Sequence, residues 1–329
     1  MIRTYSYPRA ALIGNPSDGY FGKTIAFIFK NFEASVSLKE SDRLQILPCE
    51  RDGLVFQDVH DLTKSVNEHG YYGGVRLIKA AIKVFCEYCT AHNISIPDRS
   101  FTISYSSNIP NRLGLAGSSA IVTATFRAIM QFYDIGIPQP ILANLILSAE
   151  KDELKIGAGL QDRVAQVYAA PVHMNFARSL MEQRGHGDYV AFDKALLPNI
   201  YLAYRTDLSE GSEVLHNNLA SRYASGEPAV LQAIEQWKEC TDEVWERLQS
   251  GNKDIAELIN RNFDIRSSIC AISDGNKALI DTARSTGASS KFTGSGGAII
   301  GTYKDEKIFE ELVLAMKKIN AVVIKPEIA

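Results

Sequence analysis

The chain is organised around one glycine- and serine-rich segment, Ile109-Pro-Asn-Arg-Leu-Gly-Leu-Ala-Gly-Ser-Ser-Ala120. Pro110 prevents a preceding strand from simply continuing, because proline lacks the N–H group that a strand ladder uses. Gly114 and Gly117 permit the backbone to adopt positive φ. An apolar run follows directly, so the segment predicts a loop that opens a helix.

The start of this helix has the properties of a phosphate-binding site. Ser118 and Ser119 are preferred helix N-cap residues. A helix start presents unpaired N–H groups and the positive end of the helix dipole, where a phosphate binds well. The two hydroxyls would add hydrogen-bond donors and a magnesium ligand. An ordinary capped helix after a tight turn explains the segment equally well, so this stretch alone leaves both interpretations open.

Length and composition limit the possible classes of protein. The chain has 329 residues, for which two domains are expected, and its 46% hydrophobic and 22% charged residues are typical of a soluble globular protein. The net charge of -3 and the absence of basic blocks argue against nucleic-acid binding. No apolar run approaches the length of a membrane span, and the N-terminus lacks a signal-peptide pattern. We therefore expect a cytoplasmic protein, monomeric or a small homo-oligomer, with small-molecule partners.

The cysteines and histidines form no metal-binding pattern. Five scattered cysteines indicate a reducing compartment rather than a disulfide framework. Cys86 and Cys89 belong to residues 74–91, where apolar side chains recur at helical spacing, so they are expected on a buried helix face. The six histidines are also scattered.

Two turn-rich segments are candidate ligand sites. Residues 3–13 predict a strand that runs into Gly14-Asn-Pro-Ser-Asp18, where Asn15, Ser17 and Asp18 could orient a polyhydroxylated ligand. A surface turn is the alternative.

Gly70-Tyr-Tyr-Gly-Gly74 is the second turn-rich segment, and it opens the cysteine-bearing helix. Tyr71 and Tyr72 suggest a ligand-facing turn, and the planar guanidinium of Arg76 could bind an anionic group. A tyrosine pair packed at a domain edge beside a solvated arginine explains the pattern equally well.

The remaining segments predict an α+β chain with a domain boundary near residues 193–198. Residues 31–38 and 44–47 alternate as strands of an antiparallel sheet, and residues 50–69 are polar and irregular. Further strands are expected at 101–105, 171–176, 200–204 and 299–303, and further helices at 139–150, 159–168, 228–250, 254–272 and 275–286.

Asp162 lies at the start of the helix predicted at 159–168, where it is either an early-turn acid that complements the helix dipole or a catalytic group. Residues 289–298 form a second donor-rich loop. Two such loops from different halves, facing one cleft, would clamp a nucleotide and a small acceptor.

The chain resembles the GHMP-superfamily kinases, which include galactokinase, homoserine kinase, mevalonate kinase and phosphomevalonate kinase. Three motifs match in order, at residues 8–18, 110–120 and 291–298. The resemblance is strongest to the glucuronokinases, and it rests on the motifs Gly14-Asn-Pro-Ser-Asp18, Gly70-Tyr-Tyr-Gly-Gly-Val-Arg76, Leu147-Ser-Ala-Glu-Lys151, Gly159-Leu-Gln-Asp-Arg-Val-Ala-Gln-Val-Tyr168, Asn262-Phe-Asp-Ile-Arg266 and the loop after Lys291. Gly14-Asn15-Pro16 replaces the glycine-glutamate-histidine turn of galactokinases, so galactose contacts cannot be transferred.

This resemblance implies a two-domain GHMP kinase fold. Residues 1–195 would form an N-terminal β/α domain with the phosphate loop, and residues 196–329 a C-terminal ferredoxin-like α/β sandwich. The implied reaction is ATP- and Mg²⁺-dependent phosphorylation of the anomeric hydroxyl of D-glucuronate. A kinase for another sugar, such as galacturonate, a heptose or galactose, and a catalytically silent sensor of ATP and sugar are the alternatives.

The resemblance also implies roles for individual residues. Asp162 would be the base, with Arg9 as its basic partner, and Glu150 with Ser119, or Ser118 in its place, would ligate magnesium. Arg76 or Arg163 would meet the C6 carboxylate of a uronate. The nucleotide-binding set is Pro110, Arg112, Gly114, Leu115, Ala116, Gly117, Ser118, Ser119, Ala120, Gly294, Ser295 and Gly296. The substrate-binding set is Asn15, Ser17, Asp18, Tyr20, Tyr71, Tyr72, Arg76, Arg163 and Lys291.

Overall fold

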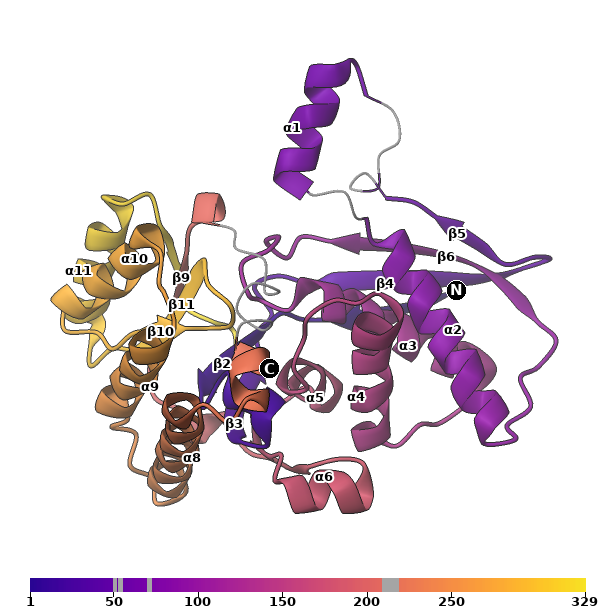
Figure 1. Ribbon diagram of the computed structural model, residues 1–329. Helices are drawn as coiled ribbons and strands as arrows, with labels where there is room; N and C mark the ends of the chain where they lie inside the picture. Colours follow the sequence, from indigo (N-terminus) through magenta and orange to yellow (C-terminus); the bar gives the residue numbers. More distant parts are fainter. Residues whose placement is uncertain (50–51, 53–55, 70–72, 209–218) are drawn as a thin grey trace.

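Three four-stranded sheets organise the part of the chain that the computed structural model describes, which is residues 1–329 except 50–51, 53–55, 70–72 and 209–218 (Figure 1). Their strand orders are β1-β4-β6-β5, β2-β3-β7-β8 and β10-β11-β9-β12. The strands are β1 (Ile2–Ser6), β2 (Arg9–Ile13), β3 (Lys23–Ile28), β4 (Ala34–Ser41), β5 (Gln45–Leu47), β6 (Ser100–Ser107), β7 (Val172–Asn175), β8 (Asp188–Ala191), β9 (Ile200–Tyr204), β10 (Lys291–Phe292), β11 (Ala298–Thr302) and β12 (Val322–Ile324).

Helices cover these sheets, and the mixed α+β class is confirmed. The α-helices are α1 (Val59–His69), α2 (Val75–Ala91), α3 (Gly117–Tyr133), α4 (Gln139–Ser148), α5 (Gln161–Tyr168), α6 (Arg178–Arg184), α8 (Pro228–Gln249), α9 (Ala256–Ile269), α10 (Asp274–Ser285) and α11 (Glu306–Lys317). Short helical turns occur at Ser17–Tyr20, Lys194–Leu196 and Thr206–Leu208, and a π-helical turn at Ala149–Glu153 continues α4. No helix among the described residues is long and apolar enough to cross a bilayer.

The single strand expected at residues 3–13 is wrong, because the structure has two strands there, in different sheets. β1 pairs with β4, whereas β2 pairs with β3. Pro8 lies between them, and proline cannot donate to a continuing ladder. The change of sheet brings Arg9 to the inside of the molecule, where it is 4% exposed.

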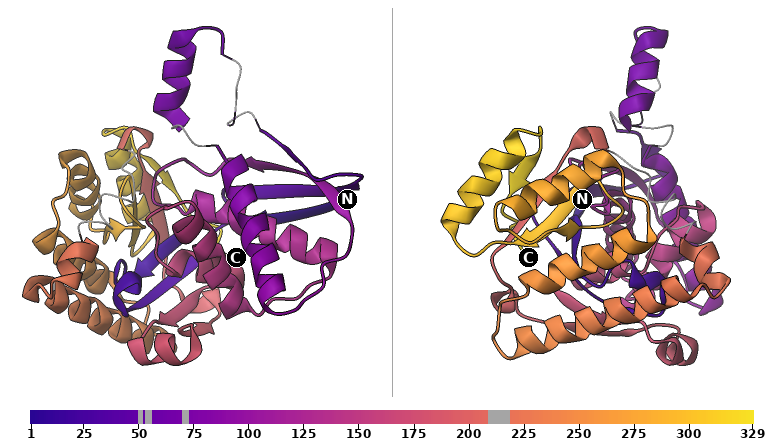
Figure 2. Two further views of the ribbon diagram at one scale, coloured as in Figure 1. Left: turned by 45° about the vertical axis from the view of Figure 1, so that its right-hand side comes forward. Right: turned by 60° about the vertical axis from the view of Figure 1, so that its left-hand side comes forward.

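Two expectations for the segment after β4 are also wrong. β5 pairs with β6 in parallel and not antiparallel. Parallel pairing needs a long connection, and here it contains α1 and α2. The polar region expected to be irregular contains α1, whose start is capped by the Asp58 carboxylate through the N–H groups of His60 and Asp61. In Figures 1 and 2, α1 projects away from the rest of the molecule.

The helix expected at 74–91 is α2, but only one of its two nearby cysteines is buried. Cys89 is fully buried, whereas Cys86 is exposed. Residues three apart on a helix differ by about 60° in direction, so the apolar face that includes Cys89 leaves Cys86 at its edge.

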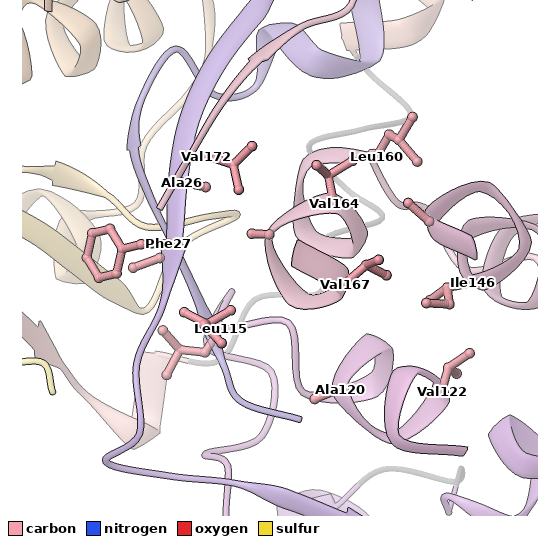
Figure 3. Close-up of a cluster of buried hydrophobic side chains, with 14 of the residues drawn as sticks. Ala26, Phe27, Leu115, Ala120, Val122, Ile146, Leu160, Val164, Val167 and Val172 are labelled. Atoms are coloured by element: carbon pink, nitrogen blue, oxygen red, sulfur yellow. The ribbon is translucent and has the colours of Figure 1, made fainter. Parts of the chain in front are cut away.

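One hydrophobic core holds α5 in place between the second sheet and helices α3 and α4 (Figure 3). The buried side chains of Val164 and Val167 lie between strand residues on one side and helix residues on the other. Those neighbours include Ala26, Val172, Ala120, Val122 and Ile146. Because protein interiors are close-packed, α5 and the polar residues at its start have a fixed position.

The same core continues into the second half of the chain. It includes Trp237 and Leu248 of α8 and Ile259 of α9, together with Phe27 of β3. A second cluster fills the space between the third sheet and α10 and α11. The boundary near residue 195 therefore stays a prediction, since α8 and α9 are packed on the first half.

Candidate active site

The loop at 109–116 connects the end of β6 to the start of α3 with an unusual backbone. Gly114 has a positive φ of +64°, as expected. Two non-glycine residues also have a positive φ, Arg112 at 56° and Ala116 at 60°. Gly117 does not adopt positive φ, because it is already the first residue of α3. The carbonyl of Ala116 is held by the Nε2 amide of Gln166 at 3.0 Å, which fixes the entry into the helix.

Ser118 and Ser119 are inside the first turn of α3 and do not cap it, so the N-cap expectation is wrong. The Ser118 hydroxyl donates to Glu150 Oε1 at 2.6 Å, and the Ser119 hydroxyl donates to the carbonyl of Ala116 at 3.0 Å. Among the described residues, no group accepts a hydrogen bond from the N–H groups of residues 117–119. These donors and the helix dipole make the start of α3 a suitable anion site. The side chain of Leu115 is buried, so this residue contributes only backbone to the loop. Ala120 is buried inside α3, and its N–H donates to the carbonyl of Ala116 at 3.1 Å.

Two carboxylates and two arginines lie beside this loop and form a series of ion pairs in which acid and base alternate. Arg9 Nη2 lies 2.6 Å from Asp162 Oδ1, and the other oxygen of Asp162 lies 3.1 Å from Arg163 Nη1. Arg163 also donates through Nε to Glu150 Oε2 at 2.8 Å. Arg163 is 2% exposed and Glu150 is fully buried, so each of these buried charges is neutralised by its neighbour. The last contact of this series is from Glu150 to Ser118, in the first turn of α3.

Arg163 is therefore a residue of the carboxylate cluster. It makes two contacts to Glu150, one to Asp162 and one to the carbonyl of Gly159. These four bonds use most of its donors, and its guanidinium is buried. Its expected role toward a substrate carboxylate stays a prediction. Its contacts hold the carboxylates of Glu150 and Asp162 in position.

The turn after β2 carries a second buried acid. Asp18 lies in the helical turn Ser17–Tyr20 and accepts hydrogen bonds from the backbone N–H and the Nε2 amide of Gln161. Burial, and secondly the charge of Asp162, raise the pKa of Asp18 to about 7. An alanine at Gly159 would collide with this carboxylate, since its Cβ would lie 2.0 Å from Asp18 Oδ2.

Two uncommitted acceptors lie near this acid. Asn15 Oδ1 and Gln161 Oε1 are both buried and accept no hydrogen bond from the described residues. Buried acceptors of this kind are costly unless a ligand or water donates to them. Sugar hydroxyls supply such donors.

The other residues of this turn have structural contacts. Ser17 donates to the carbonyl of Lys23 at 3.0 Å and is fully buried. The ring of Tyr20 packs on Tyr223, with centroids 5.0 Å apart. Their expected substrate contacts stay a prediction, since these contacts are made within the protein.

The second donor-rich loop, at 293–297, connects β10 to β11 and meets the first loop directly. A Cβ on Gly114 would lie 2.8 Å from the nitrogen of Ser295, and one on Gly294 would lie 2.4 Å from the oxygen of Gly114. Arg9 joins the two loops, because its Nη1 donates to the carbonyls of Gly114 at 3.2 Å and Thr293 at 2.5 Å. The two loops are thus in direct contact, and the cleft expected between them stays a prediction.

Lys291 lies in β10, just before the second loop. It is 1% exposed, and its Nζ donates to the carbonyls of Ala11 at 2.7 Å and Phe292 at 2.9 Å. Burial and the charges of Arg9 and Arg266 hold the pKa of Lys291 well below its usual value. The ammonium connects β2 to β10, so its contacts are those of a link between the two halves.

Three residues with important contacts received no role from the sequence. They are Gln161, Asn262 and Arg266, which hold the turn after β2 or the loop at 293–297. The resemblance motifs contain all three, but their roles come from partners far away in the sequence. Arg76 lies half-buried in the first turn of α2, and Tyr71 and Tyr72 lie outside the described residues.

The donor set suits magnesium better than a transition metal. No group of three or more histidine, cysteine or acidic side chains among the described residues could hold a metal by itself. The neighbouring oxygens of Ser118 and Glu150 are hard ligands, and Mg²⁺ typically combines one or two protein oxygens with substrate phosphates and water.

Comparisons with known proteins agree with this arrangement. Residues 76–170 match the family model described as the GHMP kinases N terminal domain. The chain is 41% identical over 308 residues to "Glucuronokinase 1" of Arabidopsis thaliana, covering 91% of this chain and 84% of that protein. It is also 41% identical over 303 residues to "Probable glucuronokinase 2" of the same plant, covering 90% of this chain and 82% of that protein.

Solved structures share the fold. Mevalonate kinase from Methanococcus jannaschii superposes with a TM-score of 0.69 at 18% identity, covering 98% of this chain and 96% of that chain. Galactokinase from Lactococcus lactis, solved with galactose, superposes with a TM-score of 0.74 at 14% identity, covering 99% and 93%. At such identities these structures establish the two-domain architecture and nothing about the acceptor.

Proposed function

The chain belongs to the GHMP kinase family and is an ATP-dependent sugar kinase, and we propose that its acceptor is D-glucuronate, phosphorylated at the anomeric hydroxyl to give D-glucuronate 1-phosphate and ADP. The main support is the 41% identity to the two Arabidopsis proteins over about nine-tenths of the chain. The observation that supports the chemistry is the position of Asp162, an acid held by two arginines beside the phosphate loop.

The phosphates of ATP would bind at the start of α3 and against the loop at 293–297. Both segments offer backbone N–H groups that have no partner among the described residues. Phosphoryl transfer needs positioning and charge stabilisation more than covalent chemistry, and fixed backbone donors supply both.

Asp162 would accept the proton of the acceptor hydroxyl. In this step the sugar oxygen forms a bond to the γ-phosphorus, the bond from that phosphorus to the bridging oxygen of ADP breaks, and the hydroxyl proton passes to the Asp162 carboxylate. Arg9 and Arg163 fix both oxygens of this carboxylate, so the acid cannot rotate away from the hydroxyl.

Magnesium fits beside Ser118 and Glu150. Glu150 has one oxygen committed to Arg163, while the other meets the Ser118 hydroxyl. We propose Ser118 rather than Ser119 as the hydroxyl ligand, because the Ser119 hydroxyl is bonded to the carbonyl of Ala116. When bound, the ion neutralises charge on the phosphates.

The uronate carboxylate needs a cation, and Arg76 is the better of the two arginines expected to supply it. Arg163 is occupied by Glu150 and Asp162. Arg76 is half-buried at the start of α2, two residues after the glycine pair Gly73-Gly74. We propose that its guanidinium binds the C6 carboxylate in a bidentate manner.

One experiment tests the reaction and the base together. The purified protein is incubated with ATP, Mg²⁺ and glucuronate, galacturonate, glucose, galactose or a heptose, while ADP release and the phosphorus NMR spectrum of the product are followed. We expect an anomeric phosphate formed fastest on glucuronate, and Asp162→Asn to lower kcat about 10²- to 10⁴-fold with ATP binding retained.

Other outcomes have distinct meanings. Faster turnover on another sugar would show that glucuronate is not the preferred acceptor. It would not contradict the kinase fold or the proposed base. Binding of ATP without turnover on any sugar would contradict the proposed reaction and favour a sensor. Full activity of Asp162→Asn would exclude this residue as the base.

A further inference from the structure

Arg266 holds the second loop in the orientation that presents its N–H groups. It is 4% exposed on α9 and donates from Nη1 to the carbonyl of Gly294 at 2.8 Å and from Nη2 to the carbonyl of Ser295. Its guanidinium also lies over the ring of Phe292, 4.6 Å from the centroid. A planar fork held in this way grips two successive carbonyls at once.

The consequence follows from peptide geometry. A trans peptide unit is planar, so its C=O and its N–H point in opposite directions. The carbonyls of Gly294 and Ser295 share their peptide units with the N–H groups of Ser295 and Gly296. Because the two carbonyls point toward Arg266, these two N–H groups point away from it.

A third peptide unit of this loop is held by another arginine, Arg9. The carbonyl of Thr293 accepts hydrogen bonds from Arg9 Nη1 and from the N–H of Ala11. Its peptide partner is the N–H of Gly294. In the described part of the chain, the N–H groups of residues 294–296 donate to no acceptor. Successive backbone N–H groups without an acceptor are typical of loops that bind anions.

The N–H group of Ser295 lies beside the phosphate loop. The nitrogen of Ser295 would be 2.8 Å from a Cβ on Gly114, which is in the loop before α3. Arg266 therefore affects the nucleotide site indirectly, through the backbone of Gly294 and Ser295. Its charge next to two carbonyls also polarises the peptide units, which strengthens their N–H groups as donors.

We propose that Arg266 is a positioning residue for ATP, because it fixes the two peptide units whose N–H groups receive the phosphates. This inference rests on the proposed nucleotide site at 293–297. It does not depend on which sugar is the acceptor.

The test compares Arg266→Gln and Arg266→Lys with a matched control, Arg284→Gln. Arg284 is also an arginine that lies over a phenylalanine, 5.1 Å from the ring centroid of Phe263, and donates to backbone carbonyls, but none of these belongs to residues 293–297. The Kd of Mg-ATP is measured by calorimetry without sugar, and kcat and both KM values are measured with the best sugar of the panel. Thermal unfolding shows whether each variant is folded.

For Arg266→Gln we expect a Kd for ATP at least tenfold higher and a kcat about 10²-fold lower, with the KM of the sugar within about twofold. Arg266→Lys should fall between this variant and the wild type, because an ammonium can hold one carbonyl but not both. Arg284→Gln should keep both values within about twofold.

Unchanged ATP affinity and kcat in a folded Arg266→Gln would overturn the proposal. If that variant does not fold, Arg266→Lys decides, and wild-type ATP affinity there would have the same meaning. An equal loss in Arg284→Gln would show a general effect of the helix packing and would also overturn it. Failure of the glucuronate proposal is seen separately, in the sugar preference of the wild type.

Discussion

Arg9 is the residue at which three parts of the site meet. One guanidinium contacts the carboxylate of Asp162, the carbonyl of Gly114 in the first loop and the carbonyl of Thr293 in the second. The ion pair between Arg9 and Asp162 that the resemblance implied is present. Because the fork of an arginine is rigid, the positions of Asp162 and of both loops depend on one another. A lysine could replace the charge but not this geometry.

Asp18 should make stability depend on pH in an unusual direction. Its pKa rises from 3.8 to about 7, so the folded protein holds a proton that the unfolded chain releases near pH 4. Between these values the folded state binds more protons, and the free energy of unfolding falls as pH rises; above pH 7 the cost is complete. Asp18→Asn removes this cost. We expect the difference in unfolding free energy, variant minus wild type, to grow by about 2–4 kcal/mol from pH 4.5 to pH 8.

Urea unfolding at the two pH values measures this difference. Asp134→Asn is a suitable control, because Asp134 is exposed and its left-handed backbone at φ 55° suits asparagine. An equal difference at both pH values for Asp18→Asn would show that this carboxyl does not carry the effect.

Arg76 should decide between charged and neutral sugars. Losing a charge-assisted bidentate contact costs about 1.5–3 kcal/mol, so Arg76→Ala should raise the KM for glucuronate about tenfold or more. Activity on glucose should change little, since glucose has no carboxylate. Steady-state kinetics on both sugars measures the ratio. Lys79→Ala, an exposed position on the same helix, is the control, and an unchanged preference in Arg76→Ala would exclude this arginine.

At the scale of elements, the contact between the two loops depends on a missing side chain. Gly114 has φ +64° and faces Gly294 and Ser295 at distances that leave no room for a methyl group. Gly114→Ala should therefore cost about 1 kcal/mol from the backbone alone. It should also push the loops apart, which lowers kcat/KM for ATP more than stability.

Denaturant unfolding and ATP kinetics separate these two effects. Gly136→Ala is the matched control, because a Cβ there meets nothing within 4 Å and its φ is not positive. If Gly114→Ala keeps the ATP kinetics of the wild type, the loops do not need this close approach.

Helical elements were predictable because their pattern is local. The apolar spacing that defines α2 and α8 extends over several turns, and the structure has both helices near the expected bounds. The partner of a strand is a long-range property, so β1 and β2 were merged and the direction of β5 was wrong. The polar sequence of α1 hid its helix, although Asp58 is a recognisable cap.

At the scale of the whole molecule, the parts of the site that the sequence missed are those made by distant contacts. The ion pair of Arg9 with Asp162 was predictable because each residue belongs to a motif of the kinases that the chain resembles. Gln161 meets Asp18 across 143 positions, and Asn262 meets Gly14 across 248 positions, so neither contact has a local signal. A fold with one core shared between its halves creates many such pairs.

Asn262 shows how the second half of the chain supports the turn after β2, which is the proposed sugar site. This buried residue of α9 accepts a hydrogen bond from the N–H of Gly14 at 2.7 Å and donates to the carbonyl of Asn15 at 3.2 Å. The turn that contains Asn15 and Asp18 is thus held from the other half. Asn262→Ala would leave a buried N–H unpaired, so we expect a loss of about 1–3 kcal/mol of stability. The KM for the sugar should rise several-fold.

Asn260→Ala separates the two consequences. Asn260 is on the same helix, and its Oδ1 accepts from the N–H of Ser290 at 2.8 Å, a contact within the second half. This variant should lose some stability and keep the sugar KM of the wild type. Urea unfolding and steady-state kinetics on both variants provide the comparison. Equal sugar KM values in the two variants would mean that the turn holds its shape without Asn262, because Asn262, unlike Asn260, contacts Gly14 and Asn15.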